Sequence, residues 1–186
     1  MLFLIGMLFV GSSSASRATD ADYSRASWVA ASSKNFQRAD RPFSSPITRI
    51  VIHTTEAPYA SAIRLFAHAG PVASAAYVIR SGDGSITQMV HETDVAWHAG
   101  NRQYNATSIG IEHEAFVHDC SWYTSAMYRS SARLVAHLAT KYGIRSTART
   151  SSATTKCRTR TTWAGSAGLP TTSIPARAGT GASTCG

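Results

Sequence analysis

His53 stands where a β-branched run, Ile47–His53, comes to its end. Such a run is typical of a buried strand, and a side chain at the carboxyl end of a strand lies at the rim of a sheet, where binding sites are commonly built. Imidazole can ligate a metal ion or act as a general base, but a histidine in this place is often only a hydrogen-bonded structural residue. Position and residue type leave both interpretations open.

Glu112 and Glu114 lie two residues apart in the alternating segment 108–114, so we expect both on one face of a strand. Gly110 precedes them on that face and would leave room for a substrate or another backbone. A carboxylate on a core strand is unfavourable unless it is paired or handles the protons of a water molecule. An edge strand with a solvated acidic face would explain the same pattern.

A predicted loop brings an aromatic ring, an imidazole and an amide together at Trp97, His98 and Asn101. These groups suit the binding of a sugar or a peptide, because the ring offers an apolar face and the other two offer hydrogen bonds. A surface turn without a ligand is equally compatible with the loop alone.

Apolar periodicity indicates the elements that would position these residues. Their residue ranges are 47–53, 75–80, 85–90 and 108–114 for strands, and 60–69 and 121–142 for helices. The Asp83-Gly84 dipeptide predicts a hairpin turn, Asp119 or Ser121 is expected to cap the long helix, and Gly143 is expected to end it. Strands mixed with two packing helices predict an α/β domain.

Four motifs occur in a fixed order: Ile50–Glu56, Ala76–Ile79, Ala96–Gly100 and Ser108–Glu112. In order and spacing the chain resembles the zinc-dependent N-acetylmuramoyl-L-alanine amidases that are related to phage-type lysozyme amidases and to peptidoglycan recognition proteins. The resemblance implies a mixed central β-sheet flanked by helices and a Zn²⁺ ion held by two His and one Asp, or Cys in some relatives. It also implies peptidoglycan and its muropeptides as partners, cut between N-acetylmuramic acid and L-alanine.

Residue by residue, the resemblance implies that His53 is the first zinc ligand and that Glu112 orients or deprotonates the zinc-bound water. It implies that Tyr77 lies near the reaction centre. The residues that would line the substrate groove are Trp97, His98 and Asn101. Zinc with an open coordination position lowers the pKa of its bound water to about 7, and a nearby carboxylate can then transfer the proton.

The second half of this metal site is missing from the sequence. The family's other ligands would follow the long helix, in segments resembling Gly-His-x-Glu and Asp-Pro-Gly-Pro. The chain has no histidine after His137 and no acid after Asp119. Because catalytic zinc sites use three protein ligands, we expect weakened or lost activity. A module that binds muropeptides without cutting them is the alternative function.

A one-base shift in the encoding DNA near Ile144 would account for the missing ligands. Joining the third base of each codon to the first two bases of the next fixes the second base of each alternative codon. In that frame residues 145–160 can encode Ile-Asp-Arg-Thr-His-Ile-Val-Gly-His-Asn-Glu-Val-Pro-Asp-Pro, and residues 172–185 can encode a segment that begins His-Ile-Asp-Pro-Gly-Pro. The alternative is a natural basic tail that adheres to wall polymers.

Most of the positive charge lies in this C-terminal segment. Residues 1–144 carry 12 Lys and Arg against 10 Asp and Glu, whereas residues 145–186 carry 6 Lys and Arg and no acid. The segment is rich in Thr and Ser and holds too few large apolar side chains for a core, which predicts disorder. Its basic residues are scattered without aromatic residues between them, which argues against a nucleic-acid partner.

The N-terminal residues 1–16 combine an apolar run with small residues, which predicts a signal peptide. An uncleaved anchor is the alternative. The run is too short to span a bilayer, so we expect a secreted, periplasmic or wall-associated protein without stable membrane insertion after signal removal. Residues 17–46 are expected to form an N-terminal arm or linker, and residues 47–144 the amidase domain.

Overall fold

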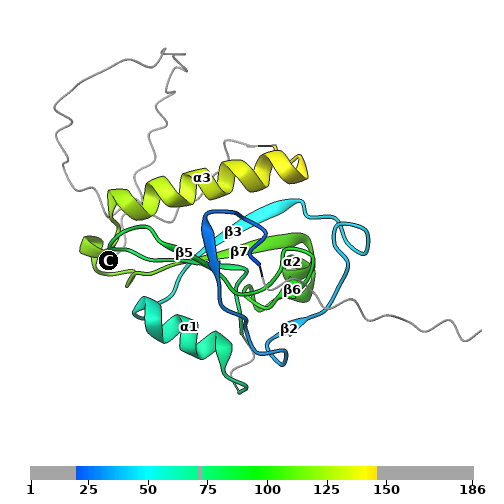
Figure 1. Cartoon of the computed structure of the whole chain (residues 1–186), viewed down its shortest axis with the longest axis horizontal. Coiled ribbons are helices and arrows are strands. Elements are labelled where there is room, and N and C mark those ends of the chain that lie inside the picture. Colours follow the sequence, from blue (N-terminus) through cyan, green and yellow to red (C-terminus); the bar gives the residue numbers. More distant parts are fainter. Residues whose placement is uncertain (1–19, 71–72, 146–186) are drawn as a thin grey trace, which may run out of the picture.

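A mixed five-stranded sheet is the centre of the fold in the computed structural model, which describes residues 20–70 and 73–145 (Figure 1). The strand order is β1-β5-β4-β7-β3. The strands are β1 (Ala26–Trp28), β3 (Arg49–Thr54), β4 (Tyr77–Ile79), β5 (Ile86–Gln88) and β7 (Ser108–His113). Only β4 and β5 pair antiparallel in this sheet, and the other neighbours are parallel. The predicted α/β class with a mixed sheet is confirmed.

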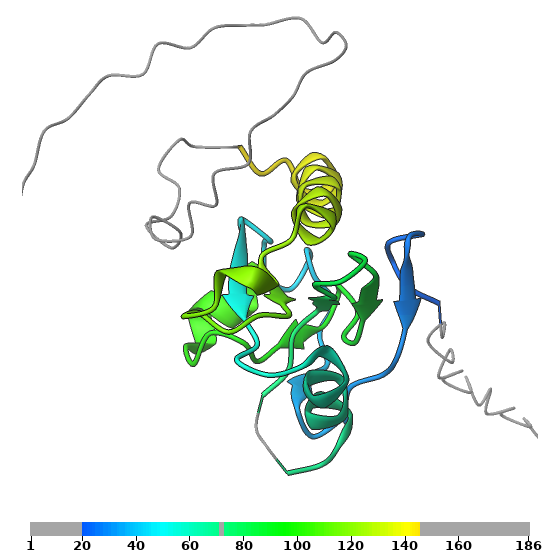
Figure 2. The ribbon, with the colours of Figure 1, turned by 90° about the vertical axis from the view of Figure 1, so that its left-hand side faces the viewer.

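One helix covers each face of the sheet, as the two perpendicular views show (Figures 1 and 2). Helix α3 (Ser125–Tyr142) buries Leu134 and Leu138 against the isoleucines of β7. Helix α1 (Tyr59–Ala67) buries Ala62 and Phe66 in a second cluster on the opposite face. Each helix therefore contributes an apolar stripe to its own core, as amphipathic helices do.

A smaller assembly stands beside the main sheet. Strand β2 (Phe36–Gln37) pairs antiparallel with β6 (Val95–Ala96), and helix α2 (Arg102–Thr107) packs against β6 and β7. A short 3₁₀ helix, Cys120–Trp122, precedes α3. These pieces hold the loop that joins β6 to α2.

The predicted helices and the hairpin are confirmed, with one change of helix cap. The hydroxyl of Thr124 accepts the amide of Met127 and caps α3, whereas Asp119 caps the 3₁₀ helix. The predicted glycine end is right, because Gly143 takes φ +63° in the left-handed region. The long helical pattern thus contained two elements rather than one.

The prediction that the strand ending at His53 is buried is wrong, because β3 is an edge strand of the sheet and none of its residues is fully buried. Ile52 is accordingly 46% exposed. Strand β7, for which an edge position was one alternative, lies inside the sheet between β4 and β3. β-branched residues fit any pleated surface, so their presence does not reveal how many neighbours a strand has.

The described part of the N-terminal segment, residues 20–46, packs on the domain as an arm and is not a free linker. It supplies β1 to the sheet and buries the ring of Tyr23. The side chain of Arg41 is 1% exposed, and its guanidinium donates to backbone carbonyls of Asn105, Ser108 and Asp94. Backbone pairing and this one cation anchor a segment whose polar composition suggested a linker.

The predicted signal peptide, residues 1–16, and residues 146–186 of the predicted tail (145–186) lie outside the described residues. Among the helices that the structure describes, none is both long and apolar enough to cross a membrane.

Candidate active site

His53 and Glu112 lie side by side at the carboxyl ends of two parallel strands. The register of β3 and β7 pairs these two residues directly. Both side chains are half-buried. The sequence predicted each as a site residue separately, and the parallel pairing brings them together at one edge, as expected for the ends of parallel strands.

The carboxyl group of Glu112 is poised for proton transfer. Its Oε2 atom is buried and has no hydrogen-bond partner among the described residues. Burial raises the pKa of this carboxyl to about 7. The side chain borders a cavity of about 320 Å³ whose other lining residues are Thr55, Ala57, Ser61, Ala62, Leu65 and Phe66. A carboxyl with a pKa near neutrality, next to open space, can both accept and return a proton.

The imidazole of His53 is held by a second imidazole. Its Nε2 lies 2.9 Å from Nδ1 of His98, and the two rings meet edge to face. Burial lowers the pKa of His53, and burial together with the nearby His53 and Arg41 lowers the pKa of His98 to about 4. Both rings are therefore neutral near pH 7, the state in which a histidine can bind a metal or accept a proton.

Gly110 makes room for His98. A Cβ atom at Gly110 would lie 2.4 Å from Cγ of His98, so any other residue here would displace the ring. The space that the sequence predicted for a substrate is thus filled by this imidazole. The amides of His98 and Ala99 donate to Oδ1 of the buried Asn105, which fixes the loop.

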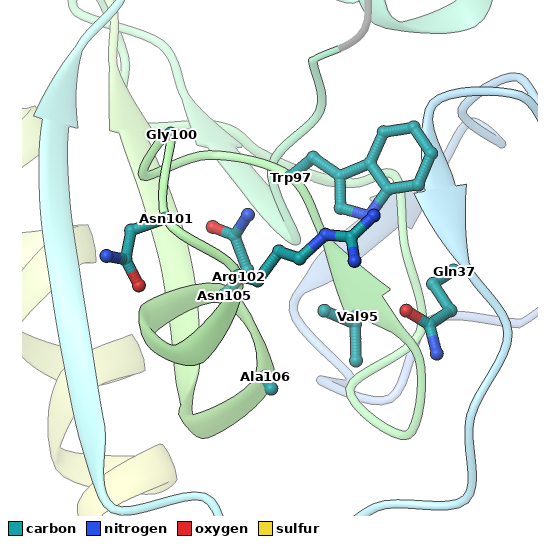
Figure 3. A pocket seen from close by; sticks show the side chains of 8 residues that line it. All are labelled: Gln37, Val95, Trp97, Gly100, Asn101, Arg102, Asn105 and Ala106. Atoms are coloured by element: carbon teal, nitrogen blue, oxygen red, sulfur yellow. The ribbon is translucent and has the colours of Figure 1, made fainter.

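Trp97 and Asn101 line a separate cavity of about 510 Å³ next to this loop. Its other lining residues are Gln37, Val95, Gly100, Arg102, Asn105 and Ala106. Figure 3 shows the side chains of Trp97 and Arg102 among those that line this cavity. Oδ1 of Asn101 accepts the amide of Tyr104 and caps α2, so this predicted binding residue also has a structural task. The prediction did not include Arg102.

The prediction that Tyr77 lies near the reaction centre is wrong. Tyr77 pairs with Ile111 and its ring is fully buried in the core on the α3 side, whereas its neighbour Val78 pairs with Glu112. Successive residues of a strand face opposite sides of the sheet, so Tyr77 faces away from Glu112. Its hydroxyl donates to the carboxylate of Glu92, and burial raises its pKa.

Glu114 is a structural residue. Strand β7 ends at His113, and the carboxylate of Glu114 accepts the backbone amides of Tyr59 and Ser81, each at 2.7 Å. Both of its oxygens therefore have partners, unlike Oε2 of Glu112. Of the two acids that the sequence placed on one face, only Glu112 has an oxygen available for chemistry.

The comparisons with known proteins identify the family. A family model described as N-acetylmuramoyl-L-alanine amidase matches residues 43–165. The chain belongs to the N-acetylmuramoyl-L-alanine amidase family. The predicted resemblance is thus confirmed, and the family match extends beyond the described residues into the C-terminal segment.

N-acetylmuramoyl-L-alanine amidase A of Achromobacter lyticus is 39% identical over 123 residues, which are 66% of this chain and 66% of that protein. The chain thus spans about two thirds of that relative. The solved structure of PlyL, 17% identical, matches with a TM-score of 0.50 over 63% of this chain and 74% of that one, which supports the fold. The crystal structure of a selenomethionine derivative of AmpD is 26% identical in sequence. It matches with a TM-score of 0.48 over 65% of this chain and 77% of that one.

Members of this family are generally zinc enzymes, but the described residues do not fit a complete zinc site. No group of three or more His, Cys, Asp or Glu side chains within residues 20–70 and 73–145 could hold a metal ion. His53 offers one nitrogen, and both nitrogens of His98 lie within hydrogen-bond distance of other side chains. Since catalytic zinc needs three protein ligands, the described residues do not form a catalytic zinc site by themselves.

Proposed function

We propose that the protein is an N-acetylmuramoyl-L-alanine amidase by descent, and that activity of this chain is impaired. The substrate is the amide bond between N-acetylmuramic acid and L-alanine in peptidoglycan. The buried, unpartnered oxygen of Glu112 beside His53 carries this proposal. A buried carboxyl without a partner is destabilising, and such groups are kept where chemistry needs them.

Glu112 supplies the proton transfer that amide hydrolysis requires. A water molecule adds to the carbonyl carbon and loses a proton, and the departing amine of L-alanine must gain one. A carboxyl with a pKa near 7 accepts the first proton and returns it to the leaving nitrogen. The acid of Glu112 borders the cavity beside α1, so the scissile amide would lie in that cavity.

We further propose that the complete enzyme uses zinc, with His53 as one ligand, and that a one-base shift near Ile144 removed the other two ligands from this chain. The alternative reading of residues 145–185 restores a histidine and an aspartate in the order of the family motifs. The DNA that encodes residues 140–186 tests this directly. Codons that cannot give those two residues in the shifted frame would end the proposal.

A release assay tests the activity. Purified peptidoglycan is incubated with this chain and with a version whose residues 145–186 are translated in the shifted frame, and free stem peptide is quantified. The proposal expects release only by the second protein. Equal release by both would mean that the ligands come from other residues of this chain.

A module that binds muropeptides without cutting them is the second candidate, because the cavity at Trp97 is formed entirely by described residues. It predicts retention of this chain on purified peptidoglycan in the presence of a chelator. Trp97→Ala should reduce retention, whereas Tyr128→Ala, which removes an exposed ring elsewhere, should not. Equal retention of Trp97→Ala and the parent would remove this candidate.

We propose that the protein acts outside the cytoplasm, as a secreted, periplasmic or wall-associated enzyme. The apolar N-terminal run followed by small residues supports this location. N-terminal sequencing of the protein recovered from the culture medium or the periplasm is the test. A protein recovered only from the cytoplasm, with residues 1–16 intact, would contradict it.

A further inference from the structure

Three side chains and one backbone carbonyl form a continuous hydrogen-bond network behind the candidate site. Nε2 of His53 lies 2.9 Å from Nδ1 of His98, and Nε2 of His98 lies 3.0 Å from Oγ of Ser108. The hydroxyl of Ser108 in turn donates to the backbone carbonyl of Tyr104. This hydrogen-bond network therefore links β3, the β6–α2 loop, the first residue of β7 and helix α2.

The direction of every hydrogen bond in this network follows from its last member, the carbonyl of Tyr104. A serine hydroxyl has one proton to donate, and Ser108 gives it to the carbonyl of Tyr104, which can only accept. Ser108 must then accept from His98, so the proton of His98 is on Nε2. A neutral imidazole carries one proton, so Nδ1 of His98 accepts from Nε2 of His53.

We propose that His98 and Ser108 are positioning residues that fix His53 as its Nε2–H tautomer and leave Nδ1 as its open, unprotonated nitrogen. This inference concerns the same site as the proposed amidase function. Its test needs neither substrate nor metal, so the two proposals can fail separately.

Neighbouring residues hold the hydrogen-bond network in place. Ser108 is 1% exposed, and the Arg41 guanidinium donates to its backbone carbonyl at 2.7 Å. The ring of His98 lies directly over Gly110, and Asn105 holds the loop amides before and after it. Neither imidazole can therefore turn over without losing bonds that buried groups need. A fixed tautomer prepares the open nitrogen before any ligand arrives, as second-shell partners of site histidines do.

The test is ¹⁵N nuclear magnetic resonance of the imidazoles in the full chain at pH 8, above the ordinary pKa of histidine. The two nitrogens of each ring have different shifts when protonated and unprotonated. His53 should be in the Nε2–H form, with Nδ1 unprotonated. A proton on Nδ1 of His53 would overturn the proposal without any variant.

Ser108→Ala removes the acceptor for His98 and leaves a buried donor without a partner. The reverse arrangement, in which His98 donates from Nδ1 to His53, then competes. The ratio of the Nε2–H to the Nδ1–H form of His53 should fall at least about tenfold, the factor expected for one lost hydrogen bond. Gly110→Ala displaces the ring of His98 and should lower the ratio without touching a hydrogen-bonding residue.

Ser131→Ala is the matched control. Ser131 is also a buried serine, and its hydroxyl lies 2.9 Å from Nε2 of His113 on the other side of the sheet. This change should alter the signals of His113 and leave the ratio at His53 unchanged. If Ser108→Ala and Gly110→Ala keep the ratio of the parent, the hydrogen-bond network does not set the tautomer. An equal fall of the ratio in Ser131→Ala would lead to the same conclusion.

Discussion

Two glutamates, the buried Glu92 and the half-buried Glu112, mark the structural and the functional part of this molecule. Glu92 is 1% exposed and accepts hydrogen bonds from Tyr77, Lys141 and Tyr142, so its carboxylate is fully engaged. Glu112, in contrast, keeps one buried oxygen without a partner among the described residues. Glu92 thus stabilises the fold, whereas Glu112 keeps an oxygen available for chemistry.

Hydrogen-bond partners therefore distinguish these two glutamates better than residue type or strand position does. Burial of a charged group stabilises a fold only when partners replace the lost water. Glu92 meets this condition and Glu112 does not.

Glu92→Ala should have the largest effect on stability. It leaves the buried hydroxyl of Tyr77 without an acceptor and removes the partner of Lys141. We expect a loss of about 3 kcal/mol in the free energy of unfolding, measured by urea denaturation. Glu92→Gln, which keeps the shape and one acceptor oxygen, should lose less. Unchanged stability of Glu92→Ala would refute the structural role of Glu92.

Glu112→Gln should stabilise the protein at pH 8 by about 2 kcal/mol and have little effect at pH 4.5. The folded protein raises the pKa of Glu112 to about 7, so the native state holds a proton that the unfolded state releases. Stability is therefore full below the unfolded pKa and falls as pH rises through 7. Glutamine does not titrate and avoids this loss. Thermal unfolding at both pH values measures the effect, and a destabilised Glu112→Gln at pH 8 would contradict it.

His113→Gln should have the smallest effect, a gain in acid stability of about 1 kcal/mol at pH 5 relative to pH 7.5. Burial lowers the pKa of His113 to about 4, so the fold favours the neutral ring. Stability is present above the unfolded pKa of about 6.5 and is lost as pH falls from there towards 4. The parent and the variant are compared by unfolding at both pH values. A parallel pH dependence would show that His113 does not contribute.

Local pattern predicted most of the fold, because each element has its own periodicity and signals. The hairpin around Asp83-Gly84, both packing helices and the glycine end at Gly143 are found as predicted. The edge position of β3 was missed, because the number of neighbours of a strand is a tertiary property. For residues 17–46 the sequence left an arm and a linker open, and the pairing of β1 with β5, which only the folded chain makes, favours the arm.

The candidate site was predicted in part for the same reason. His53 and Glu112 could be found from strand ends and motifs, and the register then placed them together. Tyr77 was misplaced because a motif does not state which face of a strand a residue occupies. Ser108 and Arg41 were missed because only the folded chain brings them next to their hydrogen-bond partners. A serine at the start of a strand gives no local sign of its role.

The proposed catalytic role of Glu112 and of the missing ligands is tested by comparing stem-peptide release from purified peptidoglycan by three proteins. They are this chain, the version with residues 145–186 translated in the shifted frame, and that version with Glu112→Gln. We expect release by the shifted-frame version alone, with the other two proteins at least about a hundredfold slower. Loss of a metal ligand or of the proton-transferring carboxyl should reduce the rate more than loss of a residue that only supports a ligand. Rapid release by this chain, or by the shifted-frame version with Glu112→Gln, would contradict the proposed role.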